Sequence, residues 1–490
     1  MKGNLLFRTS VTLCLWLTVL TVAGQSGTLP VMYIETRNHQ PVTSKTVYVP
    51  ATYYLVDNLN PDMNIGNKDS PEQLEIRGRG NSSWRDAKKP YKIKLANKTS
   101  LLGMKKNRHW ALLHFHLPTV AGMQLGNIMG MEWNPSTKPV EVVLNGDYVG
   151  LYLLTETIRI GKNRLNIYEQ PNWNEDGSTI PYGWLVEVDN YYEANQIYLP
   201  ENDQWGIRIT YHSPDSLSSA QKSWLTDEFM AINTAIYDGD KTSGAWERLI
   251  DVDAMARYFI IQEVLDNSDG FHGSFYLHKD WVDDARWVAG PLWDLNCNQR
   301  EKTDYTFRMK ASYGFTPHWI GELIKDGDFC DAVKDAWNQF YPVQVQPWME
   351  YIDENLLHCG DALYQDNIRW NRSNTESISD RVERIKSSLI ANMEWFDKYL
   401  PLAAGLDHVT DPGEKIVVNV KYINLAGMSS DKPWNGVNIK LTTYGDGSVE
   451  AVKVFPTSSS SFHCGAAPLK TATAGIWVAG RATDGADALG

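Results

Sequence analysis

The chain has 490 residues, of which 43% are hydrophobic and 21% are charged, and this ordinary globular composition supports a large core. The length suggests more than one domain. The formal net charge of -13 argues against a nucleic-acid partner, because an acidic surface and the phosphates of a nucleic acid repel each other.

Residues 1–24 have the pattern of a secretory signal peptide. Lys2 and Arg8 provide a positive start, residues 11–22 form an uncharged apolar run, and small residues precede Gln25. The apolar run is short for a membrane span, and no later stretch has the apolar character needed to cross a bilayer. We therefore expect a mature chain without a transmembrane segment that is secreted, periplasmic or located at the cell surface.

Short β-rich runs dominate the first half of the chain. The sequence predicts strands at residues 31–34, 46–49, 74–95 (as strand, glycine loop and strand) and 183–189. A hairpin is expected at residues 140–154, where two apolar runs flank Asn145 and Gly146. These two residues favour a tight turn because both tolerate a positive φ.

Helical periodicity dominates the second half. Asp251 or Asp253 is a suitable cap for a helix that runs through Leu265. Further helices are predicted at residues 217–237 and 326–400. Residues 274–278 and 286–292 are expected to pair as a hairpin. Strands in the first half and helices in the second predict an α+β fold.

The composition of the chain predicts its division into segments. After the signal peptide, residues 25–400 form the main domain, and the Pro- and Gly-containing residues 401–414 form a linker. Residues 415–455 return to short alternating strands and are expected to form a small β-rich module. Residues 456–490 are rich in Ser, Ala, Gly and Thr, have little to bury, and are expected to form a low-complexity, poorly ordered tail.

The cysteines fit no zinc-binding spacing. Cys14 lies in the predicted signal peptide, which leaves Cys297, Cys330, Cys359 and Cys464. An oxidising compartment permits disulfides, and Cys330 with Cys359 is the first pair to consider. Buried free thiols are an equally open interpretation.

A cluster of cations surrounds a glycine loop at residues 77–84 of this otherwise acidic chain. The cations are Arg77, Arg79, Lys88, Lys89, Lys92 and Lys94. Gly78 and Gly80 allow the loop to present backbone N–H groups to an anion. Lys92 and Lys94 share one face of the following strand, because side chains repeat every second residue. Both a phosphate-binding loop and a solvated basic edge strand fit this pattern.

Three blocks of sequence, in this order, resemble the CotH family of atypical, secreted protein kinases. Residues 77–95 read RGRGNSSWRDAKKPYKIKL, and residues 140–158 read VEVVLNGDYVGLYLLTETI. Residues 267–270 (NSDG) and 290–296 (GPLWDLN) are similar to the catalytic region of the family. The resemblance covers residues 30–400 and implies an atypical protein-kinase-like fold that uses ATP with Mg²⁺ or Mn²⁺.

The resemblance also implies roles for individual residues. It assigns nucleotide binding to Arg77, Gly78, Arg79, Gly80, Asn81, Lys92, Lys94 and Glu156. Asp269 would orient and deprotonate the acceptor hydroxyl, and Glu156 would pair with the phosphate-binding lysine. Metal binding is assigned to Asp294, Ser274 and Asn296. From the residues alone, Glu156 also fits a surface position at a strand end, and residues 267–270 fit a simple turn.

Two functions follow from this resemblance. The first is an exported kinase that transfers phosphate from ATP to the Ser or Thr hydroxyls of a protein substrate. The second is a catalytically weak or inactive pseudokinase that acts as a secreted or cell-surface binding protein. Ser274 would bind magnesium more weakly than the Asn of kinases, and Asn296 is neutral where the family often has Asp. The 19 Trp and 24 Tyr residues keep a carbohydrate-related role open as a third reading.

Three polar residues outside these blocks have alternative readings. Glu187 and Asp189 alternate to one side of a predicted strand, so they can enter a cleft, but we interpret them as a surface pair. His212, near Ser213 and Asp215, is interpreted as a loop residue and not as part of a catalytic triad.

Overall fold

The computed structural model describes residues 27–199, 206–237, 243–299, 319–372, 376–403, 417–424, 428–432, 438–444 and 449–454. The chain divides into two compact units, Met1–Val409 and Thr410–Gly490. The predicted signal peptide, Cys464, the predicted tail and most of the predicted linker lie outside the described residues. Among the helices that are described, none is both long enough and apolar enough to span a membrane.

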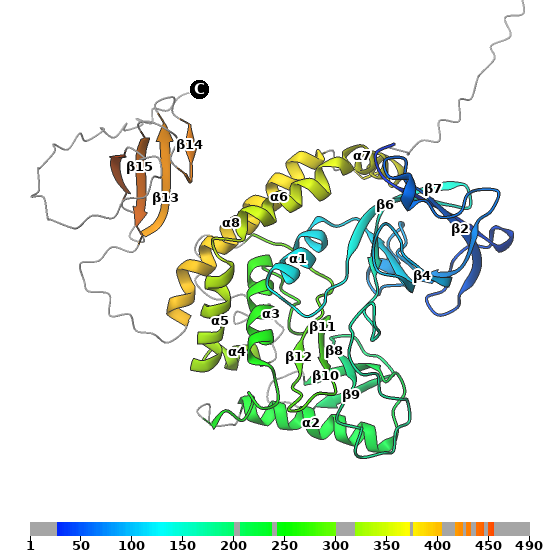
Figure 1. Cartoon of the computed structure of the whole chain (residues 1–490), viewed down its shortest axis with the longest axis horizontal. Coiled ribbons are helices and arrows are strands. Elements are labelled where there is room, and N and C mark those ends of the chain that lie inside the picture. The colour runs from blue at the N-terminus through cyan, green and yellow to red at the C-terminus, as the bar shows by residue number, and fades with distance from the viewer. Residues whose placement is uncertain are drawn as a thin grey trace, which may run out of the picture. The chain divides into compact units, whose positions relative to one another are not determined.

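Seven strands close into a barrel near the start of the chain (Figure 1). They are β1 (Val31–Thr36), β2 (Val49–Val56), β3 (Glu72–Gly78), β4 (Tyr91–Thr99), β5 (Asn107–His114), β6 (Thr137–Leu144) and β7 (Asp147–Glu156), in the order β1-β2-β3-β4-β5-β7-β6. Parallel pairing of β1 with β6 closes the barrel, and the other neighbours are antiparallel. Every second side chain of β2 and of the first half of β4 is buried, which fills the interior with residues such as Tyr53 and Ile93.

A second, five-stranded sheet has the order β12-β11-β8-β10-β9. Its strands are β8 (Trp184–Val188), β9 (Gln196–Leu199), β10 (Ile207–Ser213), β11 (Phe275–Lys279) and β12 (Val288–Ala289). Alternation along β8 places Trp184, Val186 and Val188 on the face that packs into the main hydrophobic core. Leu185 and Glu187 therefore occupy the opposite face, which is the one that forms the floor of the site described below.

The helices follow mainly in the second half of the chain. They are α1 (Leu117–Ile128), α2 (Ser219–Tyr237), α3 (Val252–Leu265), α4 (Ile320–Leu323), α5 (Gly327–Phe340), α6 (Val345–Leu356), α7 (Gly360–Arg369) and α8 (Ile378–Ala403). Short 3-10 turns occupy Arg37–His39, Pro61–Met63, Ser83–Arg85 and Leu357–Cys359. Asp251 caps α3, since its side chain accepts a 2.7 Å hydrogen bond from the Ala254 N–H.

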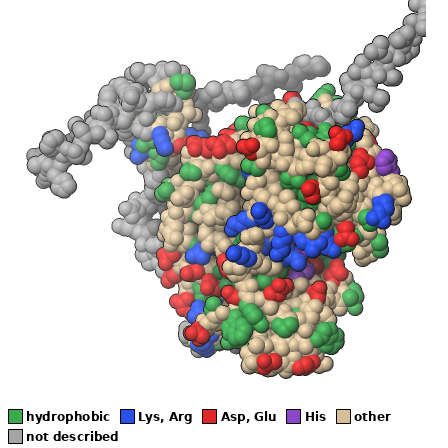
Figure 2. Space-filling view, turned by 45° about the vertical axis from the view of Figure 1, so that its right-hand side comes forward, with side chains coloured by type: hydrophobic (Ala, Val, Ile, Leu, Met, Phe, Trp, Pro, Cys, Tyr) green, Lys and Arg blue, Asp and Glu red, His purple; other side chains and the backbone are tan. Residues whose placement is uncertain are grey.

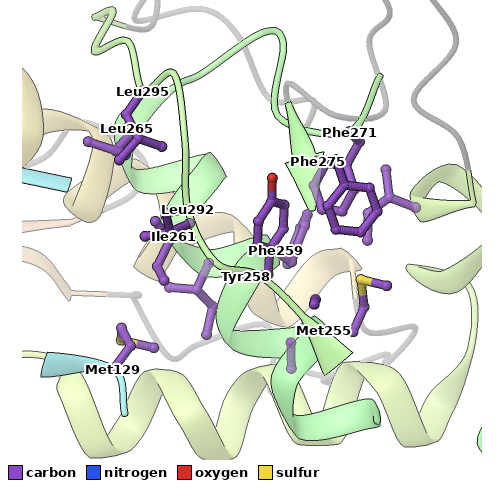
Figure 3. Packing of buried hydrophobic residues seen from close by; sticks show 14 of the residues in the cluster. Met129, Met255, Tyr258, Phe259, Ile261, Leu265, Phe271, Phe275, Leu292 and Leu295 are labelled. Carbon is purple, nitrogen blue, oxygen red and sulfur yellow. The ribbon is translucent and has the colours of Figure 1, made fainter. Parts of the chain in front are cut away.

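Helix α3 anchors the loops that carry the predicted catalytic residues (Figure 3). Its buried face packs with Phe271, Phe275, Leu292 and Leu295 in one hydrophobic cluster. The first two flank the segment that contains Ser274, and the last two flank Asp294. Because these apolar neighbours are fully buried, the polar residues between them are held at the edge of the core.

The second unit contains a four-stranded antiparallel sheet in the order β14-β13-β15-β16. Its strands are β13 (Val417–Asn424), β14 (Ser429–Ser430), β15 (Asn438–Tyr444) and β16 (Val449–Val454). The α+β prediction is thus confirmed, with strands prevailing in the first half of the chain, helices in the second, and a β-rich segment near the end.

One expectation about the fold is wrong: the strand expected at residues 46–49 instead begins at Val49, where β2 starts. Of the two open readings of the cysteines, the structure supports free thiols at Cys297, Cys330 and Cys359 and not a disulfide between Cys330 and Cys359. Burial raises the pKa of Cys330 to about 11 and that of Cys359 to about 12, as expected for thiols in apolar surroundings.

Candidate functional site

A cleft of about 560 Å³ lies where the glycine loop after β3 faces the polar face of the five-stranded sheet. We call it the acidic cleft. Its walls are Arg79, Gly80, Asn81, Ser82, Ser83, Glu187, Asp189, Asn190, Tyr191, Glu193, Asn195, Thr210, His212, Asp269, Gly273, Ser274, Tyr276, Trp293 and Asp294. Figure 2 shows a band of Lys and Arg side chains across the middle of one face of the molecule, with Asp and Glu side chains close below it.

The two loop glycines have different surroundings. Gly78 ends β3, and a Cβ there would lie 2.3 Å from the Trp84 ring, so this glycine makes room for an indole. Gly80 has a φ of +84° and lines the acidic cleft. Asn81 also lines the cleft and accepts a 3.1 Å hydrogen bond from Lys45 Nζ. A ligand in the cleft can therefore approach the backbone at Gly80.

The loop arginines also differ. Arg77 hydrogen-bonds the Lys45 carbonyl and lies 5.1 Å from the centre of the Tyr48 ring, and it does not line the acidic cleft. Arg79 lines the cleft and stacks over the Trp293 ring at 5.3 Å. Enclosure lowers the pKa of Arg79, and the nearby Asp294 carboxylate opposes this effect.

The two lysines of β4, Lys92 and Lys94, have different surroundings. Lys94 Nζ lies 3.0 Å from Glu75 Oε2, in an ion pair across the β3–β4 ladder. Lys92 lines a neighbouring cavity instead. Burial lowers the pKa of Lys92 to about 8, with further contributions from the positive charges of Arg77, Arg159 and Arg79. Lys92 is thus a desolvated cation among other cations.

Glu156 does not pair with either strand lysine. Its Oε1 lies 2.7 Å from Arg164 Nη1, and its Oε2 accepts a 3.1 Å hydrogen bond from the Ser136 N–H. Burial raises the pKa of Glu156, although Arg164 opposes the shift. The expected lysine–glutamate pair is therefore wrong, because the end of β7 meets the loop that carries Arg164.

Asp269 and Asp294, the predicted catalytic residue and metal ligand, both line the acidic cleft. A hydrogen bond from His272, which lies 3.4 Å away, lowers the pKa of Asp269 despite partial burial. Loss of hydration raises the pKa of Asp294, and the charges of Asp269 and Glu187 add to the rise while Arg79 counteracts it. The pKa values of these two carboxylates are therefore shifted in opposite directions within one cleft.

Of the two other predicted metal ligands, Ser274 and Asn296, only the first lies in the cleft wall. Ser274 and Asp294 have φ values of 52° and 51°, which non-glycine residues rarely adopt. Such backbone strain is common where a fold orients side chains toward a ligand.

The carboxylates near the end of β8 form part of the cleft and are not a surface pair. Glu187 is 8% exposed and lies on the floor of the acidic cleft, and Asp189 lines the same cleft at the end of the strand. Desolvation, together with the charge of Glu187, raises the pKa of Asp189 to about 6. Their spacing of two residues predicted that both side chains lie on one face of the strand. The sequence alone does not indicate whether that face meets the cleft or the solvent.

His212 lies in strand β10, contrary to its interpretation as a loop residue. The pairing of β10 with β8 shifts register between Tyr211 and Ser213, so His212 occupies a β-bulge. Its Nε2 lies 2.7 Å from Glu187 Oε2, and its ring stacks on Tyr276 at 5.3 Å. Tyr276 also hydrogen-bonds Glu187. The bulge thus directs the imidazole across the floor of the cleft.

A second cavity of about 640 Å³ adjoins the acidic cleft, and His212 lines both. We call it the hinge cavity, because the segment between the barrel and the five-stranded sheet borders it. Its walls are Lys92, Ile158, Arg159, Ile160, Glu169, Gln170, Pro171, Asn172, Leu185, His212, Ser213 and Asp215.

The donor atoms of the acidic cleft suit a hard divalent cation. Carboxylate and hydroxyl oxygens are the ligands that Mg²⁺ and Mn²⁺ prefer, and Asp294 and Ser274 offer them beside Arg79. Another acidic group, Glu247 with Asp326 and Asp328, has ligand atoms within 4.8 Å of one another but does not line the cleft. The Asp326 oxygens already accept hydrogen bonds from the Phe329 N–H and from Trp246 Nε1.

A comparison with known proteins identifies the family of the chain. The family model described as CotH kinase protein matches residues 76–396, more than half of the chain, from β3 in the barrel to α8. No curated protein matches the chain. The chain belongs to the CotH kinase protein family.

Proposed function

We propose that the protein is an exported, atypical kinase that transfers the terminal phosphate of ATP to the Ser or Thr hydroxyls of a protein substrate. The observation that supports this best is the meeting of Asp269, Asp294 and Arg79 in one cleft beside the Gly80 loop. Phosphoryl transfer requires a cradle for phosphates, oxygen ligands for a metal ion and a carboxylate near the acceptor. In this proposal the barrel and the helix-rich part serve as the two lobes of a kinase-like fold.

Each residue has a defined task in this proposal. Asp294 and Ser274 would hold a divalent ion, which when bound neutralises charge on the transferring phosphate. Arg79 and the N–H groups around Gly80 would bind phosphate oxygens. Asp269, kept ionised by its lowered pKa, would accept a hydrogen bond from the acceptor hydroxyl, orient it and take its proton.

The pseudokinase alternative has its own supporting observations. Asn296 lies outside the described cleft walls, and Lys92 has no glutamate partner of the kind that orients the nucleotide lysine in protein kinases. A protein of this kind would hold a nucleotide, or a partner, without transferring phosphate.

Incubation with γ-labelled ATP, Mg²⁺ or Mn²⁺, and a Ser-rich acceptor protein tests the kinase proposal. We expect label on the acceptor or on the protein itself, and we expect Asp269→Asn and Asp294→Asn each to remove it. Asp283→Asn, at an exposed position outside the cleft, should retain labelling. Nucleotide-dependent thermal stabilisation without labelling would favour the pseudokinase, and the absence of both would exclude a nucleotide function.

Export is a separate part of the proposal and rests on the sequence pattern of residues 1–24. Expression in a secreting host should release a chain that begins at Gln25, as measured by N-terminal sequencing. Retention of the full-length chain inside the cells would contradict export and would leave the proposed chemistry unaffected.

A further inference from the structure

We propose that the outer face of the barrel binds an acidic saccharide, in a cavity separate from the acidic cleft and the hinge cavity. We call it the tyrosine cavity, after Tyr33 and Tyr54 in its floor. Its volume is about 620 Å³, within the range of about 300–1,000 Å³ that is typical of small-molecule sites. It shares no wall residue with the other two cavities, so the proposal goes beyond the proposed function and does not depend on it.

Outward-facing side chains of β1, β2 and β3 form the floor of the tyrosine cavity. Alternation along these strands turns residues such as Ile34 and Tyr53 into the barrel and leaves Tyr33, Tyr54 and Gln73 outside. Tyr33 and Tyr54 are cross-strand partners whose rings stack, with centroids 4.4 Å apart and an interplanar angle of 11°. Such a pair stabilises a sheet, and it also offers a ligand a rigid surface that is apolar along the rings and polar at the hydroxyls.

A fastened loop forms one rim of the tyrosine cavity, at residues 37–39. Asn38 and His39 have φ values of 56° and 53°, which non-glycine residues rarely adopt. Thr36 Oγ1 donates a 2.7 Å hydrogen bond to the carbonyl of Gln40, which ties the two ends of the loop together. Strained backbone held in this way is common beside binding sites.

The opposite rim is also fixed by its own hydrogen bonds. Lys68 and Pro71 line the cavity there, in the turn that precedes β3. Asn67 Oδ1 accepts hydrogen bonds from the N–H groups of Asp69 and Ser70, each 2.9 Å long. Because both rims are ordered before a ligand arrives, less conformational entropy is lost on binding.

Four polar side chains of the tyrosine cavity are available to a ligand. Within the part of the chain that the structure describes, the side chains of Arg37, Thr52, Lys68 and Gln73 form no hydrogen bond and no ion pair. The two cations can only donate, whereas the hydroxyl and the amide both donate and accept. Glu35 is the single carboxylate of the cavity wall, and His39 Nε2 lies 3.3 Å from its Oε2. Free donors therefore exceed free acceptors in this cavity.

This set of groups fits a saccharide that carries carboxylates, such as a chain of uronic acids. The apolar faces of its rings suit the tyrosines, its hydroxyls both donate and accept, and its carboxylates suit Arg37 and Lys68. A peptide strand fits less well, because β1, β2 and β3 are each paired on both sides and offer no free edge.

Native gels that contain polygalacturonate, alginate or hyaluronan test the proposal with the full-length protein. We expect at least one of these uronate polymers to retard the protein without divalent cations, and we expect fully methyl-esterified polygalacturonate not to retard it. The net charge of -13 works against retardation by general attraction to a polyanion. Retardation by none of the three polymers, or equal retardation by the esterified one, would overturn the proposal.

Tyr54→Ala and Lys68→Gln should each weaken binding at least about tenfold, as measured from the dependence of retardation on polymer concentration. Tyr364→Ala and Lys98→Gln make the same changes at exposed positions outside the cavity and should leave binding unchanged. Undiminished binding by folded Tyr54→Ala and Lys68→Gln variants would overturn the site. Label transfer from ATP tests the proposed function separately, and we expect both variants to retain it.

Discussion

Lys92, in the wall of the hinge cavity, is a buried cation whose charged neighbours are other cations. Burial and the charges of three arginines hold its pKa at about 8. Below that pH the side chain is charged and ready to bind phosphate, and above it the side chain is mostly neutral. An anionic ligand favours the charged form, so ligand binding should raise this pKa and take up a proton at alkaline pH.

Nucleotide affinity should therefore fall as the pH rises above about 8, approaching about tenfold for each pH unit. Titrations of Mg²⁺–ADP between about pH 7 and pH 9 would measure this dependence. Lys92→Arg should give a nearly flat profile, because a guanidinium stays charged throughout this range. A falling affinity that persists in Lys92→Arg would assign the dependence to another group.

Prediction from sequence was uneven at this scale. Asp269 lies in a turn-forming motif and Asp294 follows an apolar run, and the structure places both in the wall of one cleft. The partner of Glu156 was not accessible, because it depends on how the segment after β7 folds back toward Arg164. Glu187 was misjudged because strand alternation groups side chains on a face without saying what that face meets.

At the scale of elements, the end of β3 is built around the contact of Gly78 with Trp84. The backbone at Gly78 lies beneath the indole, and Lys89 Nζ holds the Trp84 carbonyl at 2.8 Å. This contact closes the base of the loop that presents Gly80 to the cleft.

Gly78→Ala should lower the free energy of unfolding by about 1–3 kcal/mol, because its Cβ would overlap the Trp84 ring and displace it. Chemical denaturation would measure the change. Gly177→Ala is the control, since a Cβ at that position meets nothing within 4 Å. Equal unfolding free energies for the two variants would show that the ring moves aside without cost.

A buried ion pair connects the loop after β3 to α7. Lys88 Nζ lies 2.5 Å from Asp366 Oδ1, and both side chains are almost fully buried. Asp366 also accepts a 3.0 Å hydrogen bond from the Leu151 N–H of β7. Desolvation lowers the pKa of Lys88 to about 8, and the charge and the hydrogen bond of Asp366 oppose this shift. Loss of Asp366 would therefore remove the partner that stabilises the buried ammonium group.

Asp366→Asn should destabilise the protein by about 3–5 kcal/mol, because it leaves the Lys88 charge buried and unpaired. Lys88→Met in the same chain should restore part of that loss, as measured by urea unfolding of the single and double variants. The exposed pair of Arg369 with Asp147 is the control, and Asp147→Asn should cost less than about 1 kcal/mol. Additive losses in the double variant would contradict a coupled buried pair.

Local signals predicted several elements well. The Asn145–Gly146 turn joins β6 and β7 as expected, and α3 begins after Asp251. Both signals depend on residues adjacent in sequence, where turn and capping chemistry acts directly.

For the first unit as a whole, no local sequence pattern predicted that the strands close into a barrel. The parallel pairing of β1 with β6 joins Val31 to Glu141, and no short-range pattern specifies such a distant pair. The same limit applies to the site, because the acidic cleft combines the loop after β3 with strands and loops more than 100 residues later. The sequence therefore predicted the α+β class and individual residues, and the assembly of the cleft emerged only from the fold.

Diffraction from crystals of the full-length protein with Mn²⁺ and a non-hydrolysable ATP analogue tests whether the acidic cleft binds a metal ion with a nucleotide. We expect an anomalous Mn²⁺ peak in contact with the Asp294 carboxylate, with phosphates between that ion and Arg79. Analogue bound elsewhere, or Mn²⁺ found only at Glu247, Asp326 and Asp328, would contradict it.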